Sequence, residues 1–228
     1  MGDQGDADIT TIGNPLLQTV SHHWPSLQIR FKTACSLFLT DAKSNNDPVP
    51  RRHVAILLAS ILEVVSDLSG LCGDFIADKF SNGIWPQISQ LLNYFLKQSK
   101  TDSVTTVSPG DSELLLSILS CMNEMYSSKS CGKMLSNTTS IAGTIILPFL
   151  SHDNEIGEYA VKAIQSILLI DYDCLSRALL SLSGSDIPQR PILPHPNRVN
   201  EQKLDPLLAK RSKDLIAFIE RLPEQPFQ

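Results

Sequence analysis

The sequence predicts an all-α fold, an α-solenoid of stacked helical repeats, and three observations lead to this prediction. Leu, Ile and other apolar residues recur at three- and four-residue steps along most of the 228-residue chain, which is the period of an amphipathic helix. No segment shows the sustained alternation of apolar and polar residues that a half-buried strand requires. Similar helical patterns also follow one another along the chain, as in a repeat protein.

Composition supports helices packed through aliphatic side chains. The hydrophobic content of 42% and the charged content of 19% are typical of a globular protein, whereas aromatic residues make up only 6% and Gly occurs 11 times. The net charge of -5 and the pI near 5.5 argue against a general binder of nucleic acid or of anionic membranes, which needs a basic face.

The cysteines and the N-terminus indicate a reducing compartment. The chain has five cysteines and no close CxxC pair, so buried, reduced thiols are expected. The acidic N-terminus lacks the apolar stretch of a secretory signal. No run of residues is expected to reach the roughly 18 apolar residues of a membrane span. We therefore expect a cytoplasmic protein, with a nuclear location also open, and no membrane partner.

The first half of the chain contains five expected helical segments. Residues 1–13 are polar and are predicted to be disordered. Asn14-Pro15 should begin a helix, because Asn is a good N-cap and Pro is favoured at the first helical position. Trp24-Pro25 should end that helix and begin a second one, before a loop at 41–50. The remaining expected segments are a helix at 51–68, a break near Gly70 and Gly73, a short helix with Phe75 and Phe80, a break at Asn82-Gly83, and a helix from Ile84.

The second half continues in the same way after a polar loop at 97–110. Asp111 or Ser112 should cap the next helix, and a helix at 141–150, a turn at 151–154 and a helix at 156–168 should follow. Asp171 or Asp173 should cap a further helix. The proline-rich stretch 183–202 reads as a stiff linker, although it could also present a polyproline helix to an aromatic groove. The predicted organisation is a disordered 1–13, a repeat domain at 14–182, a linker at 183–202, and an amphipathic helix and tail at 203–228.

An internal repeat underlies the solenoid prediction. A shift of 59 residues brings Cys72-Gly73 onto Cys131-Gly132, each placed just after a long apolar helix. Each pair is followed by a short helix and then by an apolar helix containing a proline, Pro86 or Pro148. Because a lone helix of this length is marginal in water, each should bury its apolar stripe on its neighbours.

Residue patterns for catalysis or metal binding are not found. The five histidines (22, 23, 53, 152 and 195) lack metal-ligand spacing, and the rings of His22 and His23 should point about 100° apart. Asp171 and Asp173 begin like a calcium loop, but Leu175 replaces the third ligand. Phosphate-binding and serine-hydrolase motifs are absent. We therefore predict no catalytic, cofactor-binding or metal residues, no cofactor and no enzymatic activity, with a cysteine nucleophile left as an alternative.

Several segments of residues 14–182 resemble one known family. They are Asn14-Pro15-Leu16-Leu17, His23-Trp24-Pro25-Ser26-Leu27, Cys72-Gly73-Asp74-Phe75-Ile76, Lys79-Phe80, Ile84-Trp85-Pro86-Gln87-Ile88 and Ile170-Asp171-Tyr172-Asp173. Their order is similar to that in the C-terminal HEAT-repeat region of the largest subunit of the triple-T (TTT) complex, the telomere-maintenance-protein-interacting subunit one family. Members of that family are far longer, so the chain looks like a C-terminal fragment, a truncated gene model or a short paralogue.

The resemblance implies a HEAT-type, non-enzymatic scaffold. The triple-T complex acts as a co-chaperone that supports the folding, assembly and stability of phosphatidylinositol-3-kinase-related protein kinases. The implied partners are the other triple-T subunits, the ninety-kilodalton heat-shock chaperone with its adaptors, and those kinases. No functional residue is carried over from the family. The alternative is a generic HEAT-repeat adaptor of transport or phosphatase type, and a third hypothesis is a small all-α cysteine hydrolase.

Overall fold

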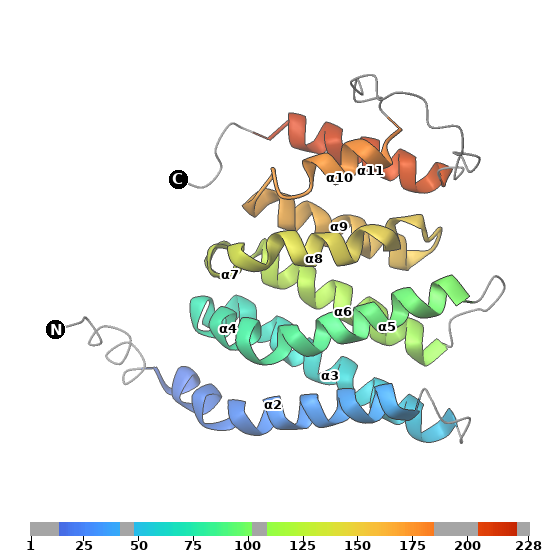
Figure 1. Ribbon diagram of the computed structural model, residues 1–228. Helices are drawn as coiled ribbons and strands as arrows, with labels where there is room; N and C mark the ends of the chain where they lie inside the picture. The colour runs from blue at the N-terminus through green and yellow to red at the C-terminus, as the bar shows by residue number, and fades with distance from the viewer. Residues whose placement is uncertain (1–13, 42–47, 102–108, 185–204, 223–228) are drawn as a thin grey trace.

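The computed structural model describes residues 14–41, 48–101, 109–184 and 205–222, and within them the chain consists of helices joined by short turns and has no strand, as the all-α prediction requires (Figure 1). The predicted disordered residues 1–13 and nearly all of the predicted linker at 183–202 lie outside the described residues, as do 42–47 and 102–108 of the predicted loops at 41–50 and 97–110. The described ends of these two loops are helical, so both loop predictions are too long.

The structure has helices of two lengths, long ones that form the stack and short ones that connect them. In chain order they are α2 (Pro15–Asp41), α3 (Pro48–Cys72), α4 (Asp74–Lys79), the π-helical turn η1 (Phe80–Ile84), α5 (Trp85–Thr101), α6 (Pro109–Ser127), α7 (Lys129–Met134), the 3-10 turn η2 (Ser136–Thr138), α8 (Thr139–Ile146), the 3-10 turn η3 (Leu147–Ser151), α9 (Glu155–Ile170), α10 (Ser176–Leu182) and α11 (Pro206–Glu220).

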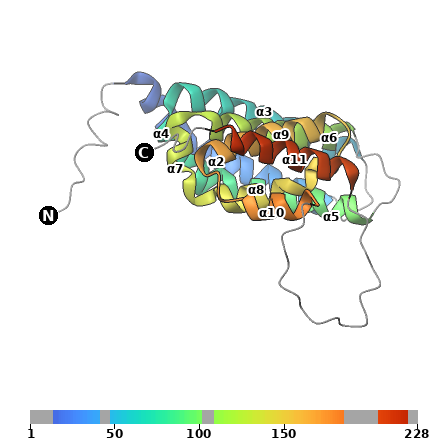
Figure 2. The same ribbon diagram turned by 90° about the horizontal axis from the view of Figure 1, so that it is seen from above.

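The helices stack in two rows. One row is α3, α6 and α9, in which α6 packs against α3 on one side and α9 on the other. The second row contains α2, α5 and α8, with α4 packed on α7 beside it. Seen from above, α3, α6 and α9 lie along one side of the molecule, and α5, α8 and α10 along the other (Figure 2). This layering is what an α-solenoid requires.

The core runs along the whole stack between the two rows. Side chains with no more than 1% exposure come from α2, α3, α5, α6 and α9, including Phe31, Leu62, Leu92, Leu119 and Ile164. At roughly 1.5–3 kcal/mol for each fully buried aliphatic or Phe side chain, this burial is the main term that stabilises the stack.

The break predicted at Trp24-Pro25 is wrong, because α2 continues through Pro25. Trp24, one position before the proline, is 4% exposed and lies on the buried stripe that continues through Phe31 and Phe38. Pro25 itself faces outward, so its ring meets solvent. Burial of one continuous stripe therefore outweighs the loss of one backbone hydrogen bond at the proline.

Three other predicted helix boundaries differ from those in the structure. The predicted break at Asn82-Gly83 is instead the π-helical turn η1, which joins α4 to α5 without a gap. α6 begins at Pro109, so neither Asp111 nor Ser112 is its N-cap. α10 begins at Ser176, and Asp171 accepts a hydrogen bond from the backbone N–H of Cys174 at 3.1 Å, which closes a turn before the helix. Asn14 and Asn154 do act as predicted caps or turn formers, accepting from Leu16 N–H and Ile156 N–H at 3.0 and 3.1 Å.

The two Cys-Gly pairs have different roles, although the stack brings them close together. Gly73 has φ of +50°, which a side chain disfavours, and it ends the sharp turn between α3 and α4. Gly132 lies inside α7, where an added Cβ would come within 2.9 Å of Ile170 Cδ1. The Cys131 thiol lies 3.2 Å from the Gly73 carbonyl oxygen, so the second pair packs directly on the first.

By length and composition alone, Arg51–Cys72 is apolar enough to cross a membrane, which corrects the expectation that no run comes close to that. Packing in the stack accounts for part of this composition, because 33% of the 18-residue window is buried. This segment of α3 packs against α2, α4 and α6, and residues such as Leu58, Leu62 and Val65 are fully buried in those contacts.

Arg51 joins three helices through polar contacts. From α3 it donates to Asp111 of α6 through Nε and Nη2, at 3.2 and 2.9 Å, and to the hydroxyl of Tyr94 of α5 at 2.8 Å. Its guanidinium carbon also lies 4.3 Å from the ring centre of Phe38 in α2. Burial alone would lower the pKa of Arg51, but the bonds to Tyr94 and Asp111 outweigh it and raise that pKa, so the group stays charged.

Replacement of Arg51 should weaken the whole stack. We expect Arg51→Ala to lower the free energy of unfolding by about 2 kcal/mol, because a two-bond ion pair and a cation–π contact, both mostly shielded from water, are lost together. Urea denaturation measures this. The neighbouring exposed Arg52→Ala should change the same quantity by less than about 0.5 kcal/mol. Equal losses in the two variants would show that the Arg51 contacts contribute nothing particular.

The helix α11 (Pro206–Glu220) packs on the part of the described stack that α9 and α10 form. α11 packs on α10, α9 and η3, with Leu215 fully buried and Asp205 capping its first turn by accepting from Leu207 N–H at 2.8 Å. Arg211 donates to the backbone oxygens of Leu150, at 2.8 Å, and of His152. The guanidinium lies against Gly157, where an added Cβ would overlap it.

Stability should depend on pH through His152. Burial lowers the pKa of His152, the nearby Arg211 lowers it further, and Asp153 opposes them. The unfolded chain therefore binds a proton at higher pH than the folded chain does, so this contribution is complete above about pH 6.5 and is lost as the pH falls below it. We expect the urea midpoint to drop between pH 7.5 and pH 5.5, and to drop less in His152→Asn.

The exposed His53 offers the matched control for this measurement. His53→Asn should keep the pH dependence of the unaltered chain. An identical pH dependence in the His152 and His53 variants would contradict the assignment to His152.

Candidate functional site

The structure describes His22, His23, His53 and His152, whereas His195 lies outside the described residues. His22 and His23 are exposed on α2, and their rings meet edge to face at 4.9 Å between centroids, so the expectation that the rings point apart is wrong. In the part of the chain that the structure describes, no three His, Cys, Asp or Glu residues are grouped so that they could hold a metal ion.

The five cysteines are free thiols, of which Cys35, Cys121 and Cys131 are buried and Cys72 and Cys174 are half-buried. Burial raises the pKa of Cys35, Cys121 and Cys174 to about 12, and it raises the pKa of Cys72 and Cys131 as well. A bond to Ser66 opposes this effect at Cys121, and Asp171 adds to it at Cys174. A thiol acts as a nucleophile only as the thiolate, and raised pKa values disfavour that form.

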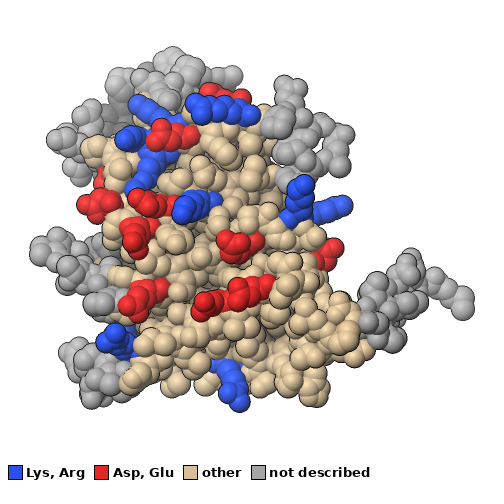
Figure 3. All heavy atoms as spheres, turned by 180° about the vertical axis from the view of Figure 1, so that it is seen from behind, with Lys and Arg blue, Asp and Glu red and all other residues tan. Residues whose placement is uncertain are grey.

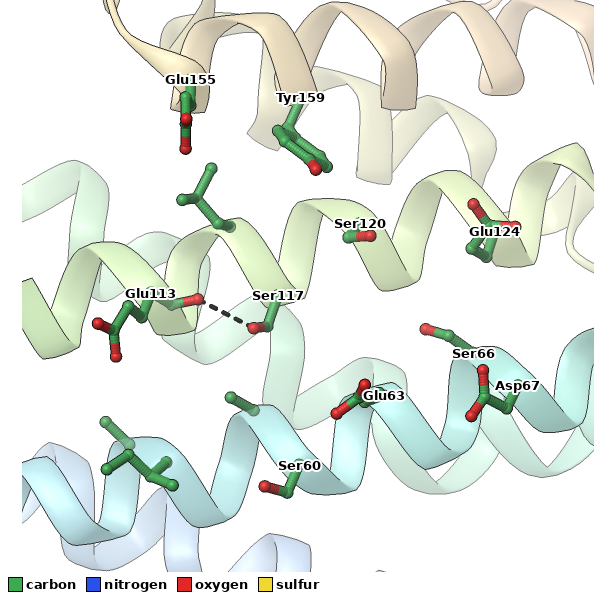
Figure 4. Close-up of a pocket in the computed structure, with 14 residues that line it drawn as sticks. Ser60, Glu63, Ser66, Asp67, Glu113, Ser117, Ser120, Glu124, Glu155 and Tyr159 are labelled. Atoms are coloured by element: carbon green, nitrogen blue, oxygen red, sulfur yellow. Dashed lines mark hydrogen bonds between the residues drawn. The ribbon is translucent and has the colours of Figure 1, made fainter.

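A groove crosses the outer face of the α3, α6 and α9 row, with a volume of about 670 Å³ (Figure 4). The row of α3, α6 and α9 is termed the A row, and this hollow is termed the A-row groove. All three helices contribute residues to its lining. The lining residues are Ala55, Ile56, Ala59, Ser60, Glu63, Ser66 and Asp67 of α3; Glu113, Leu116, Ser117, Ser120 and Glu124 of α6; and Glu155 and Tyr159 of α9.

Helical periodicity places these residues on one face. On α3 the lining positions recur at steps of three and four from Ile56 through Ser60 and Glu63 to Asp67, and α6 repeats the pattern from Glu113 to Glu124. Since α3 and α6 pack side by side, the two faces form one continuous surface.

Small side chains make the hollow. Alanines and serines occupy most of the positions where α3 faces α6, and they leave space that larger residues would fill. Several of the hydroxyls are satisfied within their own helices, as Ser66 donates to Leu62 O at 2.9 Å and Ser117 to Glu113 O at 2.9 Å. The floor is partly apolar and open, because Ile56 is 45% exposed and Leu116 and Tyr159 are half-buried.

The charge of the groove has one sign. Its lining contains five carboxylates (Glu63, Asp67, Glu113, Glu124 and Glu155) and no Lys or Arg. The ion pair between Arg51 and Asp111 involves none of them. Lys162 of α9 lies nearby, over the ring of Tyr159 at 4.8 Å. Seen from behind, acidic side chains lie across the middle of the molecule, over the row of α3, α6 and α9, and basic ones gather toward α11 (Figure 3).

Stability does not explain this arrangement. Glu63 and Asp67 are four residues apart on α3, both exposed, and like charges at this spacing destabilise a helix by about 0.2–0.5 kcal/mol. Glu155 is different, because a carboxylate in the first turn of α9 favours the helix dipole. A partly apolar hollow whose edge carries a charge that costs stability is a candidate binding surface.

Sequence reasoning missed this site. A signal was present, since small and acidic residues alternate along the outward positions of two predicted helices, at 59, 60, 63, 66 and 67 and again at 113, 117, 120 and 124. The pairing of those two faces could not be read without knowing which helices pack together.

Comparison with known proteins adds no relative. No protein-family model, no curated protein and no solved structure gave a significant match to this chain.

The acidic residues of the groove should be dispensable for folding. We expect Glu63→Lys to raise the free energy of unfolding by a few tenths of a kcal/mol, roughly 0.3–0.5, because it removes the repulsion with Asp67. In the control, Glu158→Lys should lower it by about 0.5–1 kcal/mol, because Glu158 lies in the first turn of α9 and four residues before Lys162. Urea denaturation measures the free energy of unfolding of both variants. A larger loss for Glu63→Lys than for Glu158→Lys would make Glu63 a structural residue.

Proposed function

We propose that this chain is a non-enzymatic scaffold of the triple-T co-chaperone complex, acting as a subunit or as part of one. In this role it would bind the other triple-T subunits and the heat-shock chaperone adaptors, and so support the assembly and stability of phosphatidylinositol-3-kinase-related kinases. The family part of the proposal rests on the resemblance of residues 14–182.

One structural observation carries the scaffold part of the proposal. The A-row groove spans three successive helices of the stack, is partly apolar at its floor and has five carboxylates at its edge. Stacked helices commonly present such extended surfaces to other proteins. The raised thiol pKa values weigh against the alternative of a cysteine hydrolase, because that chemistry needs a thiolate.

Affinity purification of the tagged chain from cell extract tests the proposal. We expect mass spectrometry to identify other triple-T subunits, the chaperone adaptors or the related kinases among the recovered proteins. Leu119→Asp provides the control, because Leu119 is fully buried in α6 and a charge there should unfold the stack and abolish the recovery.

Two results would contradict the proposal. Recovery of nuclear transport factors or phosphatase subunits in place of triple-T components would favour the alternative, a generic adaptor of transport or phosphatase type. A folded, soluble chain that recovers none of the triple-T components, chaperone adaptors or kinases would remove the family assignment from this segment.

A further inference from the structure

We propose that the A-row groove binds a basic amphipathic helix of a partner protein, with apolar side chains on the floor of the groove and Lys or Arg side chains at its acidic edge. This inference rests on the proposed function as a scaffold and names the chemistry of one partner segment. Three features of the groove support it, namely the dimensions of the groove, the exposure of its floor and the charge of its lining residues.

The dimensions of the groove suit a short helix. Its lining extends along α3 from Ala55 to Asp67 and along α6 from Glu113 to Glu124. At 1.5 Å per residue, these stretches are about 16–18 Å long, which matches roughly three turns of a bound helix. When an amphipathic helix binds in a groove between helices, it places apolar residues at steps of three and four into that groove.

The floor supplies the apolar contact. Of the apolar lining residues, Ile56 of α3 is 45% exposed, and Leu116 of α6 and Tyr159 of α9 are half-buried, so a bound apolar face would remove their exposed surface from water. Ala55, Ala59 and the serines at 60, 117 and 120 carry small side chains, which allow another helix to approach closely. Larger residues at these positions would fill the trough.

The charges define which helix fits. Glu63 and Asp67 lie on the α3 side of the trough, Glu113 and Glu124 at its two ends on α6, and Glu155 on the α9 side, as their side chains show in Figure 4. The lining contains no basic residue that could neutralise them. An acidic helix would meet five carboxylates, with Lys162 beside Tyr159 as the one nearby cation described above, whereas Lys and Arg flanking an apolar stripe would find carboxylates on the α3, α6 and α9 sides.

The proposal excludes nucleic acid as the occupant, because phosphates would face the same five carboxylates. The proposed binding also differs from attraction by charge alone, which would hold any polycation. The apolar floor should discriminate between an amphipathic basic helix and a basic segment without apolar residues.

The experiment measures binding of synthetic peptides to the full chain. The probe is a fluorescent peptide of about 16 residues, long enough for three to four turns, with Leu at steps of three and four and Lys on both flanks. One comparison peptide has Glu in place of Lys, and a second has Ser in place of Leu. Fluorescence anisotropy is recorded at low and at moderate salt.

A groove variant and a matched control locate the binding. The variant is Glu63→Gln with Glu113→Gln and Glu124→Gln, which keeps side-chain shape and removes three charges. The control, Asp173→Asn with Asp214→Asn and Glu220→Gln, also removes three exposed acidic charges, all outside the groove. We expect the Leu/Lys peptide to bind, roughly tenfold or more weakly in the groove variant and within about twofold of normal in the control. Thermal unfolding by circular dichroism verifies that both variants are folded.

The outcomes separate this inference from the proposed function. Loss of binding only in the groove variant, together with weak binding of both comparison peptides, supports the inference even if no triple-T component is recovered from extract. Equal binding of the Leu/Lys and Ser/Lys peptides, or equal weakening in the two variants, overturns it as unspecific attraction. Absence of peptide binding overturns it too, while recovery of triple-T components would leave the scaffold function standing.

Discussion

The fold depends on the burial of α6 between α3 and α9. Its apolar residues contact both neighbours as well as the second row, so residues such as Leu115, Ile118 and Met122 are almost completely enclosed. A single helix of this length gains too little from its own hydrogen bonds to persist in water. The outer long helices are stable because α6 offers each of them an apolar face, and the groove on the outer side of the row exists because those helices are held in register.

The all-α fold and the existence of most helices followed from periodicity alone, because stripes such as Val54, Leu58, Leu62 and Val65 repeat with the helical period. Boundaries were less predictable. Pro25 and Asn82-Gly83 are strong local helix breakers, yet both lie inside helical segments. The free energy gained by burying a continuous apolar stripe is larger than the free energy lost when Pro or Gly is placed in a helix. Asp111 was a plausible cap, but its partner is Arg51, 60 residues away in the sequence. Local patterns do not contain such distant contacts.

The groove could not be predicted from the sequence for the same reason. Each of its residues is ordinary in its own helix, as exposed Glu, Ser and Ala are common on solvent-facing positions. The site exists only because small residues of α3 face small residues of α6, and because carboxylates from three helices meet around them. Charge at these positions adds repulsion within α3 while the core residues beneath carry the stability. The groove and the core therefore lie on opposite faces of the same helices.

The attachment of α11 has a consequence for local opening. Within the described residues this helix packs on α10, α9 and η3, and the hydrogen bonds that join it to the stack come from Arg211, which reaches backbone oxygens beside Gly157. A helix held in this way opens at a lower free energy than an enclosed one such as α6, without global unfolding. We expect such an opening to uncover the faces of α9 and α10 that α11 covers, while the core around α6 stays closed.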